Sequence, residues 1–332
     1  MFIQRRKAIR RMFVLGLATM AATVPLIGET QTPAGYPSKS IRFVVPYAAG
    51  GLPDTVARVV AQRLQEKIGQ PVVVENRPGA NGAVAAAALS TNAADGYTFL
   101  VTDGSMFSIN PKLYSKLGYN ATQDFLPVAL VARAPLFLAT NPKLPVNSFK
   151  EFVTYVKANP GKVNYGSSGI GSTHQLTMEA LKSDLGLDMT HVPFKGTGQS
   201  VPALVGGQVE VLWSAYPSLA GFVKDNRVKI LATNGAKRST QAPDVPAVAE
   251  QIPGFDFAPI VGVLAPKGTP KGIIDKMSAE ILAVTQMPDT QKQLANSGID
   301  TVGGGAEDYA KAIASENARM AKVIEVAGIK PE

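Results

Sequence analysis

Short apolar runs alternate with amphipathic stretches along the chain from residue 41 onward. The runs are rich in β-branched residues and apolar on both faces, which is typical of buried, parallel strands. They lie at 41–45, 72–75, 98–101, 136–140, 209–213, 229–233 and 261–265. Between the first two runs, residues 54–68 repeat apolar side chains at helical spacing and predict a helix. This alternation predicts a doubly wound α/β fold.

Three further amphipathic stretches predict helices at 148–159, 271–286 and 306–326. Ser148 is a suitable N-cap for the first of them, and the following Pro160 ends it. A short strand is also predicted at 163–165, directly before a glycine- and serine-rich loop.

Two stretches, 132–141 and 255–264, are places where the chain would pass between two lobes. Residues 35–136 together with 258–332 then form one lobe, and residues 137–257 form the other. A hinge of two crossing segments follows from this division.

The first 34 residues have the three-part layout of an export signal: a basic start, an apolar stretch at 12–27, and a small, polar end. The apolar stretch is shorter than the roughly 20 residues that span a bilayer, and Pro25 interrupts it. We expect cleavage near Ala34, after export by the general or the twin-arginine route. An uncleaved anchor is the alternative. The mature protein is then expected in the periplasm.

The net charge of +8 does not indicate a nucleic-acid partner, because residues 1–34 carry +4 of it. The remaining basic residues are not interleaved with aromatic ones, as a stacking platform requires. The chain has no cysteine, which excludes disulfides, thiolate catalysis and a lipidated N-terminal cysteine. His174 and His191 are the only histidines and have no metal-site spacing, so we expect no metal and no cofactor.

The first candidate binding loop joins the strand at 41–45 to the helix after it. Pro53 stands where a helix begins without losing a needed amide. The glycines let a ligand approach the backbone, and the amides of a helix start favour an anion. A tight turn that needs glycine only for its dihedral angles is the alternative. The candidate residues are Tyr47, Ala49, Gly50, Gly51, Leu52 and Asp54, with Asp54 as a helix-start cap rather than a general base.

The second candidate loop follows the short strand at 163–165 and again leads into a helix. Its hydroxyls and exposed amides fit a carboxylate. Ser172 and Gln175 have the spacing of a capping box, so plain helix capping is the alternative. The helix dipole disfavours a charged imidazole, and His174 is predicted to be neutral. The candidates are Ser167, Ser168, Gly171, Ser172, Thr173 and His174.

Other polar residues follow or border predicted strand ends, where open α/β sheets place ligands. These further candidates are Asn81, Thr102, Ser105, Lys195, Ser214 and Tyr216. For each of them a solvated loop position is the alternative. Trp213 is predicted to lie in the core.

No catalytic signature is present. The glycines at 169 and 171 lack the third glycine of a dinucleotide fingerprint, because His174 stands at that place. There is no phosphate-binding P-loop and no GxSxG motif. We therefore expect no catalytic residue and a binding protein rather than an enzyme. An exported α/β enzyme acting on a carboxylated substrate, with Asp54 or His174 as acid or base, is the alternative.

Several sequence blocks resemble the Bug-type receptors of tripartite tricarboxylate transporters. The blocks keep the order of the family's motifs, and the resemblance covers nearly all of residues 36–332. The blocks are YPSKSIRFVVPYAAGGLPDTVAR, VVVENRPGANGAVAAAAL, DGYTFLV, GSSGIGSTHQL, HVPFKGTGQSVPALVGGQVEV, APDVPAVAEQIPGFDF and LAPKGTP.

The resemblance implies a two-lobed periplasmic-binding-protein fold of type II, in which each lobe is a sheet flanked by helices. It implies closure over a small mono- or dicarboxylate, held by loops 47–54 and 167–173 through backbone amides and ordered water. The implied partners are this ligand and the membrane subunits of a permease. A membrane sensor kinase is an alternative partner. The receptor itself is expected to be a monomer.

The sequence departs from the family pattern in two places. Many relatives carry an aspartate, suited to a ligand's ammonium group, where this chain has Ser214, so an amino-acid ligand is disfavoured. Relatives also often carry a tryptophan near the second crossing, where this chain has Ile260. The ligand of a relative therefore does not transfer directly.

Overall fold

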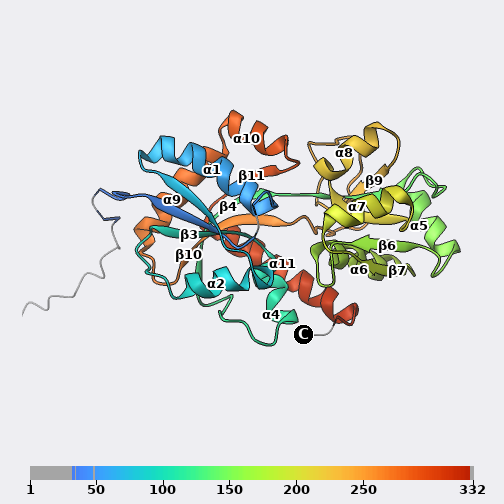
Figure 1. Cartoon of the computed structure of the whole chain (residues 1–332), viewed down its shortest axis with the longest axis horizontal. Coiled ribbons are helices and arrows are strands. Elements are labelled where there is room, and N and C mark those ends of the chain that lie inside the picture. Colours follow the sequence, from blue (N-terminus) through green and yellow to red (C-terminus); the bar gives the residue numbers. More distant parts are fainter. Residues whose placement is uncertain (1–31, 34, 48, 330–332) are drawn as a thin grey trace, which may run out of the picture.

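Two β-sheets, each flanked by helices, form two lobes that lie side by side (Figure 1). The computed structural model describes residues 32–33, 35–47 and 49–329. Residues 1–31 of the predicted export signal and Ala34, near which cleavage is expected, lie outside these residues. The predicted α/β fold with two sheet-and-helix lobes is confirmed.

The first sheet has the strand order β11-β4-β10-β3-β1-β2. Its strands are β1 Ile41–Val45, β2 Val72–Asn76, β3 Thr98–Asp103, β4 Phe125–Arg133, β10 Ile260–Pro266 and β11 Asp300–Gly304. The accompanying helices are α1 Leu52–Ile68, η1 Ala80–Gly82, α2 Ala83–Ser90, α3 Ser105–Ser108, α4 Asn110–Leu113, α9 Lys271–Thr285, α10 Pro288–Ala295 and α11 Ala306–Val326.

The second sheet has the strand order β7-β6-β8-β5-β9. Its strands are β5 Leu136–Thr140, β6 Asn164–Ser167, β7 Thr190–Pro193, β8 Val211–Ala215 and β9 Lys229–Thr233. Its helices are α5 Phe149–Ala158, α6 Thr173–Leu185, α7 Thr197–Gly206, α8 Tyr216–Lys224 and η2 Val248–Glu250.

Both sheets are mixed, which corrects the expectation of parallel strands throughout. β1 pairs in parallel with β2 and β3, but β10 runs antiparallel to both β3 and β4. The chain leaves the first sheet at the end of β4 and returns to it at the start of β10. The departing and returning strands must therefore run in opposite directions. β5, which begins at the first crossing, is antiparallel to its neighbours β8 and β9 for the same reason.

The core of the first lobe lies on both faces of its sheet, since Phe43 and Val45 of β1 belong to one buried cluster and Val44 to another. Val56, Val60 and Leu64 of α1 pack with Met277 and Ile281 of α9 in one buried cluster. These positions follow the helical spacing of the sequence, so the apolar stripe of each helix faces the sheet.

Helix α11 belongs to both lobes, which the sequence did not predict. Near its start, Tyr309 packs in a buried cluster with Leu100 of β3. Near its end, Met320 and Val323 join the cluster that contains Trp213 of β8. The two crossing segments are thus accompanied by a third link. Trp213 is buried in this core, as predicted.

Among the described residues, no helix is both long enough and apolar enough to cross a membrane.

A matched pair of glycine substitutions tests the packing of α11 on β10. A Cβ on Gly262 would lie 2.4 Å from the Tyr309 ring and 2.6 Å from the Ala129 carbonyl oxygen, whereas a Cβ on Gly221 in α8 meets nothing within 4 Å. We expect Gly262→Ala to lower the free energy of unfolding by about 1–3 kcal/mol or more. Gly221→Ala should leave it unchanged or raise it by up to about 1 kcal/mol. Urea unfolding measures both, and equal effects would contradict the packing.

Candidate functional site

The loop between β1 and α1 presents unpaired backbone amides at a helix start. Gly51 is the N-cap, with extended backbone angles and no side-chain cap, and Pro53 lies in the first turn. Among the described residues, the amides of Gly51 and Leu52 donate no hydrogen bond. Such amides, together with the positive end of the helix dipole, are suited to an anion.

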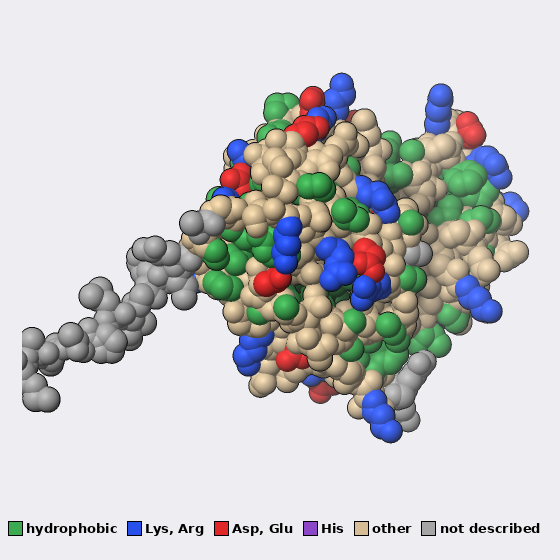
Figure 2. Space-filling model, turned by 60° about the vertical axis from the view of Figure 1, so that its left-hand side comes forward, with side chains coloured by type: hydrophobic (Ala, Val, Ile, Leu, Met, Phe, Trp, Pro, Cys, Tyr) green, Lys and Arg blue, Asp and Glu red, His purple; other side chains and the backbone are tan. Residues whose placement is uncertain are grey.

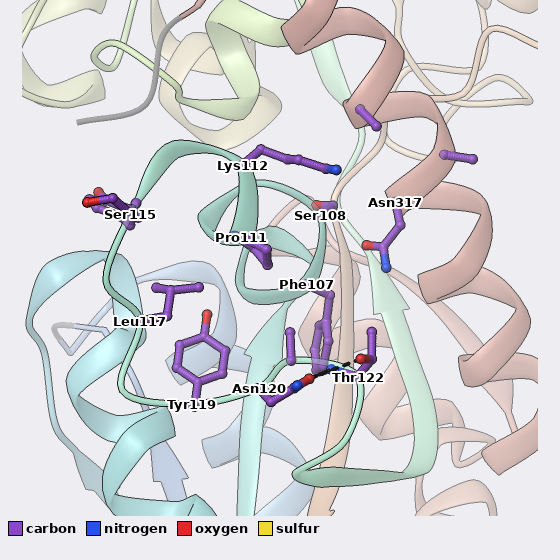
Figure 3. A pocket seen from close by; sticks show the side chains of 14 residues that line it. Phe107, Ser108, Pro111, Lys112, Ser115, Leu117, Tyr119, Asn120, Thr122 and Asn317 are labelled. Atoms are coloured by element: carbon purple, nitrogen blue, oxygen red, sulfur yellow. Dashed lines mark hydrogen bonds between the residues drawn. The ribbon is translucent and has the colours of Figure 1, made fainter.

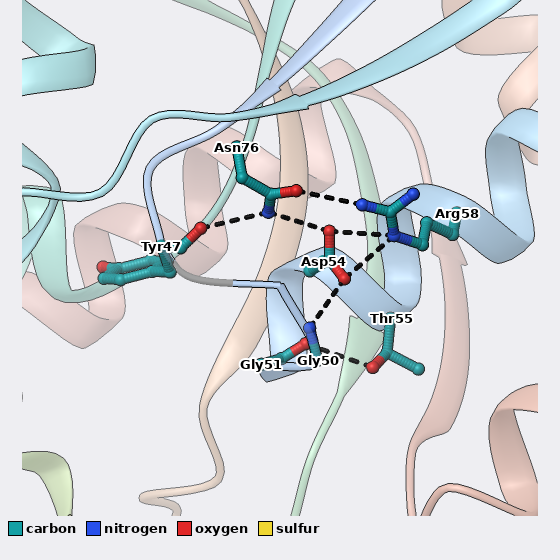
Figure 4. Close-up of polar contacts among 7 residues, drawn as sticks. All are labelled: Tyr47, Gly50, Gly51, Asp54, Thr55, Arg58 and Asn76. Carbon is teal, nitrogen blue, oxygen red and sulfur yellow. Dashed lines mark hydrogen bonds and ion pairs between the residues drawn. The ribbon is translucent and has the colours of Figure 1, made fainter.

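The side chain of Asp54 is used inside this loop (Figure 4). Its carboxylate accepts hydrogen bonds from Gly50 N at 2.8 Å, Asn76 Nδ2 at 2.8 Å and Arg58 Nε at 3.0 Å. Asp54 therefore bonds the backbone before the helix and caps none of the amides of the first helical turn, which differs from the predicted role of a helix-start cap. The amide of Gly50 is consequently not open to a ligand.

The hydrogen bonds to Asp54 also control its ionisation. Burial pushes the pKa of the carboxyl upward, but the bonds from Arg58, Gly50 and Asn76 outweigh burial and hold the pKa below its usual value. Asp54 is therefore ionised and fully engaged at neutral pH, which makes it a poor general base.

A second network joins the ends of β1, β2 and β3. The Tyr47 hydroxyl donates to Asp103 Oδ1 at 2.9 Å, and the Ser105 amide donates to the same oxygen at 3.0 Å. Asn76 Nδ2 donates to the Tyr47 carbonyl oxygen at 3.0 Å. Burial raises the pKa of Asp103 despite these hydrogen bonds. The network fixes the loops that carry two predicted site residues, Tyr47 and Ser105.

The loop between β6 and α6 repeats this design in the second lobe. Ser172 is the N-cap, and its Oγ accepts from Gln175 N at 3.3 Å. The Gln175 side chain accepts from Gly171 N at 2.7 Å, one residue earlier than a standard capping box. The amides of Thr173 and His174 donate no hydrogen bond among the described residues. Two donors of the first helical turn are thus unpaired.

The hydroxyls of this loop bond within the loop and to histidines. Ser167 Oγ lies 2.7 Å from His191 Nε2, and Ser168 Oγ lies 2.8 Å from His174 Nδ1. Burial lowers the pKa of His174 to about 4, so the neutral form predicted from the sequence is confirmed, with burial as its cause. Burial also lowers the pKa of His191.

The other candidates lie at the edges of these loops. Lys195 is exposed, and Gly196 beside it donates to the Ser168 carbonyl oxygen, which places the β7–α7 loop next to the β6–α6 loop. Ser214 is completely buried, and its Oγ has no partner among the described residues. Tyr216 opens α8, with its ring 5.5 Å from that of Phe137.

Three more candidates complete the set. Thr102 is buried and its hydroxyl donates to the Asp103 carbonyl oxygen at 3.3 Å. Ala49 is exposed in the β1–α1 loop. Asn81 lies in η1, and its side chain is outside the described part of the structure.

Sequence reasoning missed the residues that hold the loops in place. Asn76, Arg58 and Asp103 bind the predicted site residues but were not singled out. Asn76 and Asp103 are the last residues of β2 and β3, so their position at strand ends was the available signal.

Two cavities are lined by described residues, and neither contains a candidate ligand-binding residue. One, of about 620 Å³, lies between α3–α4, the segment 114–122 and α11, with Phe107, Tyr119 and Asn317 in its wall (Figure 3). The other, of about 240 Å³, lies between α6, residues 252–257 and the end of α11. The predicted carboxylate site is distinct from both.

The described residues contain no group of three or more His, Asp or Glu side chains arranged for a metal ion. On the face shown in Figure 2, Lys and Arg side chains are scattered among acidic and neutral ones rather than gathered in a continuous patch. The surface on this face thus has no strongly basic area of the kind that a nucleic acid requires.

Two sheet-and-helix lobes joined by crossing strands, each with an unpaired helix start, define a solute-binding protein of the periplasmic type. The chain belongs to the family described as the tripartite tricarboxylate transporter family receptor, TctC, whose sequence profile matches residues 56–329. The resemblance to Bug-type receptors is thereby confirmed.

Relatives and solved structures agree with this assignment. Protein BugT of Bordetella pertussis is 34% identical over 325 residues, covering 97% of this chain and 98% of that protein. An R. palustris protein solved with adipate has a TM-score of 0.77 and 33% identity, covering 90% of this chain and 100% of that one. MatC of Rhodopseudomonas palustris, solved with malate, has a TM-score of 0.71 and 31% identity, covering 87% and 100%.

Asp54→Asn tests whether this carboxylate is structural. We expect a folded protein whose free energy of unfolding at neutral pH is lower by about 1.5–3 kcal/mol, because charged hydrogen bonds are lost. The folded pKa of Asp54 is lowered, so its contribution is present above the unfolded pKa of 3.8 and disappears as the pH falls through the folded value. Urea unfolding against pH should show a deficit that shrinks in acid. The exposed Asp184→Asn is the control and should show no such deficit.

Proposed function

We propose that this chain is a periplasmic solute-binding receptor that captures a small mono- or dicarboxylate between its lobes and delivers it to a tripartite-type membrane permease. The lobes in this proposal are residues 35–136 with 258–332, and residues 137–257. The observation that carries the proposal is that each lobe has a strand-to-helix loop whose amides donate no hydrogen bond within the described part of the chain, at Gly51 and Leu52 and at Thr173 and His174.

The chemistry of these loops supports an anionic ligand. The carboxylate of Asp54 is already satisfied by its hydrogen bonds, and burial lowers the pKa values of His174 and His191, so these residues supply no cationic side chain. A carboxylate can instead be held by neutral N–H donors and the positive ends of α1 and α6. Relatives solved with adipate and with malate support carboxylates as the ligand class.

The two loops supply half of the contacts each. Leu113 of α4, in the first lobe, lies directly against Gly171 of the second loop. A Cβ built on Gly171 would lie only 2.3 Å from Leu113 Cδ1. Closure of the lobes would then bring both helix starts onto one carboxylate and supply the affinity. Ser105, Tyr216 and Lys195 are the groups that we assign to the far end of the ligand, together with the unpartnered hydroxyl of Ser214.

The proposal includes an N-terminal signal that is cleaved, a monomeric receptor and no catalytic turnover. The receptor family and the engaged state of Asp54 support a binding role over an enzymatic one. A ligand-dependent contact with a membrane sensor kinase would use the same closed form.

Titration calorimetry of the mature protein against mono- and dicarboxylates, amino acids and sugars tests the ligand class. We expect binding to one or more carboxylates, with adipate and malate as the first ligands to try, and weaker or no binding of the amine and sugar ligands. Mass spectrometry should recover the bound carboxylate unchanged. Binding of an amine or a sugar alone would refute the anion site, and conversion of the ligand would favour the exported enzyme.

A matched pair at Thr173 tests the backbone donors directly. Ser172 has φ −70° and ψ 152°, a conformation that precedes proline readily, and Thr173 is the first residue of α6, where proline is favoured. Thr173→Pro removes the amide donor while keeping the helix start. Its carboxylate affinity should fall by about 10- to 100-fold, since a charged hydrogen bond contributes about 1.5–3 kcal/mol.

Thr173→Ala is the control, because it removes the side chain and keeps the N–H group. It should bind within about threefold of the parent protein. Gly51 allows the same comparison in the other lobe, since its φ of −74° suits proline. Equal affinities for the proline and alanine variants at both positions would show that these amides do not hold the ligand.

A further inference from the structure

We propose that Glu316 of α11 is a positioning residue for the carboxylate site. Its protonated side chain, buried against the β3–α3 turn, holds Asp103 and Ser105 in the arrangement that binds the ligand. Loss of this proton should weaken carboxylate binding. The inference deepens the proposed function and rests on it.

The carboxyl group of Glu316 fills the space beside the β3–α3 turn. The residue is 6% exposed, although it lies in the middle of the last long helix. A Cβ on Gly104 would lie 2.1 Å from Glu316 Oε1 and 2.3 Å from Oε2. The carboxyl group therefore packs directly on the backbone between Asp103 and Ser105, where a larger residue than glycine has no room.

The hydrogen bonds around Glu316 leave its carboxyl group incompletely satisfied. The Ser108 hydroxyl donates to the Gly104 carbonyl oxygen at 2.9 Å and to Glu316 Oε1 at 3.0 Å. The single hydrogen of this hydroxyl is shared between two acceptors, so Glu316 Oε1 receives only part of a hydrogen bond. Glu316 Oε2 is buried and has no partner among the described residues, which would be costly for a carboxylate.

The groups around Glu316 have opposite effects on its pKa. Burial, followed by the charge of Asp103 on β3, raises the pKa of Glu316 to about 7, against the lowering effects of Ser108, of Arg319 on α11 and of Arg133 on β4. Tyr309 on α11 is a further titratable neighbour. Burial raises its pKa most, followed by the charges of Glu316 and Asp103. Glu316 thus changes charge near neutral pH.

Asp103 connects this change to the ligand loops. It accepts hydrogen bonds from the Tyr47 hydroxyl and the Ser105 amide. A second negative charge at Glu316 would repel the Asp103 carboxylate and place an anion near a site that binds anions. We expect both effects to act against the ligand.

Few other groups in this region change charge in the same range. The carboxyl groups of aliphatic carboxylate ligands are largely ionised at about pH 6 and above. The pKa of His174 is about 4, and burial lowers that of His191. Burial also raises the pKa of Asp103, which interacts electrostatically with Glu316. Affinity changes between about pH 6 and about pH 8 that disappear in Glu316→Gln are therefore assigned to Glu316 together with Asp103.

The test compares the parent protein with Glu316→Gln, which imitates the protonated acid in shape and charge. Calorimetry with adipate and malate at about pH 6 and about pH 8 measures the affinity of each protein. The affinity of the parent protein should fall by about three- to tenfold from the lower to the higher pH. The affinity of Glu316→Gln should be the same at both pH values. Glu325→Gln, an exposed position on the same helix, is the control and should keep the dependence of the parent protein.

Thermal unfolding without ligand gives a second measurement. A folded pKa above the unfolded value of 4.5 means that the folded state holds the proton longer, so stability falls as the pH rises toward about 7. The melting temperature of the parent protein should fall more than that of Glu316→Gln over this range. Equal pH dependence of the two proteins, in either affinity or melting temperature, would overturn the proposal. If no carboxylate binds at any pH, the proposed function fails, while the melting curves still report whether Glu316 titrates.

Discussion

Unpaired N–H groups at the first turns of α1 and α6 are the constraint on which the rest of this structure depends. Each helix leaves its first amides without a partner in the helix, and burying them without an acceptor is costly. The Gly51 and Thr173 amides remain unpaired among the described residues, in loops that lie in different lobes. A ligand carboxylate can satisfy donors from both lobes at once, and this links binding to closure.

The side chains around these amides serve mainly to hold the backbone. Asp54 is paired with Gly50, Asn76 and Arg58, and Asp103 is paired with Tyr47 and Ser105. The hydroxyls of the second loop are bonded in the same manner, to backbone oxygens or histidines. Because these charged groups are already satisfied, the proposed recognition relies on neutral donors that the surrounding hydrogen bonds hold in place.

The local parts of this arrangement were readable from the sequence, and the long-range parts were not. β1 and β9 lie where the apolar runs placed them, and Ser148 and Ser172 cap their helices as predicted. The strand predicted at 209–213 lies two residues later. β4, β7 and β11 were not predicted. β7 and β11 are short and partly exposed, so they lack the apolar run of a buried strand. β4 does contain a buried apolar run, at 128–132, of the same kind as the predicted strands, so this strand was readable from the sequence.

Long-range packing also explains why Asp103 and Glu316 were missed. They lie more than 200 positions apart in the sequence and meet only because α11 packs across β4.

α11 also restricts how the lobes can move. Its Tyr309 is buried with the first sheet, and its Met320 and Val323 are buried with the second. A movement that pulled α11 away from either sheet would expose these side chains, at about 25 cal/mol for each Å² of apolar surface. Any closure of the lobes that keeps both ends of α11 packed would leave Glu316, in the middle of this helix, against the β3–α3 turn.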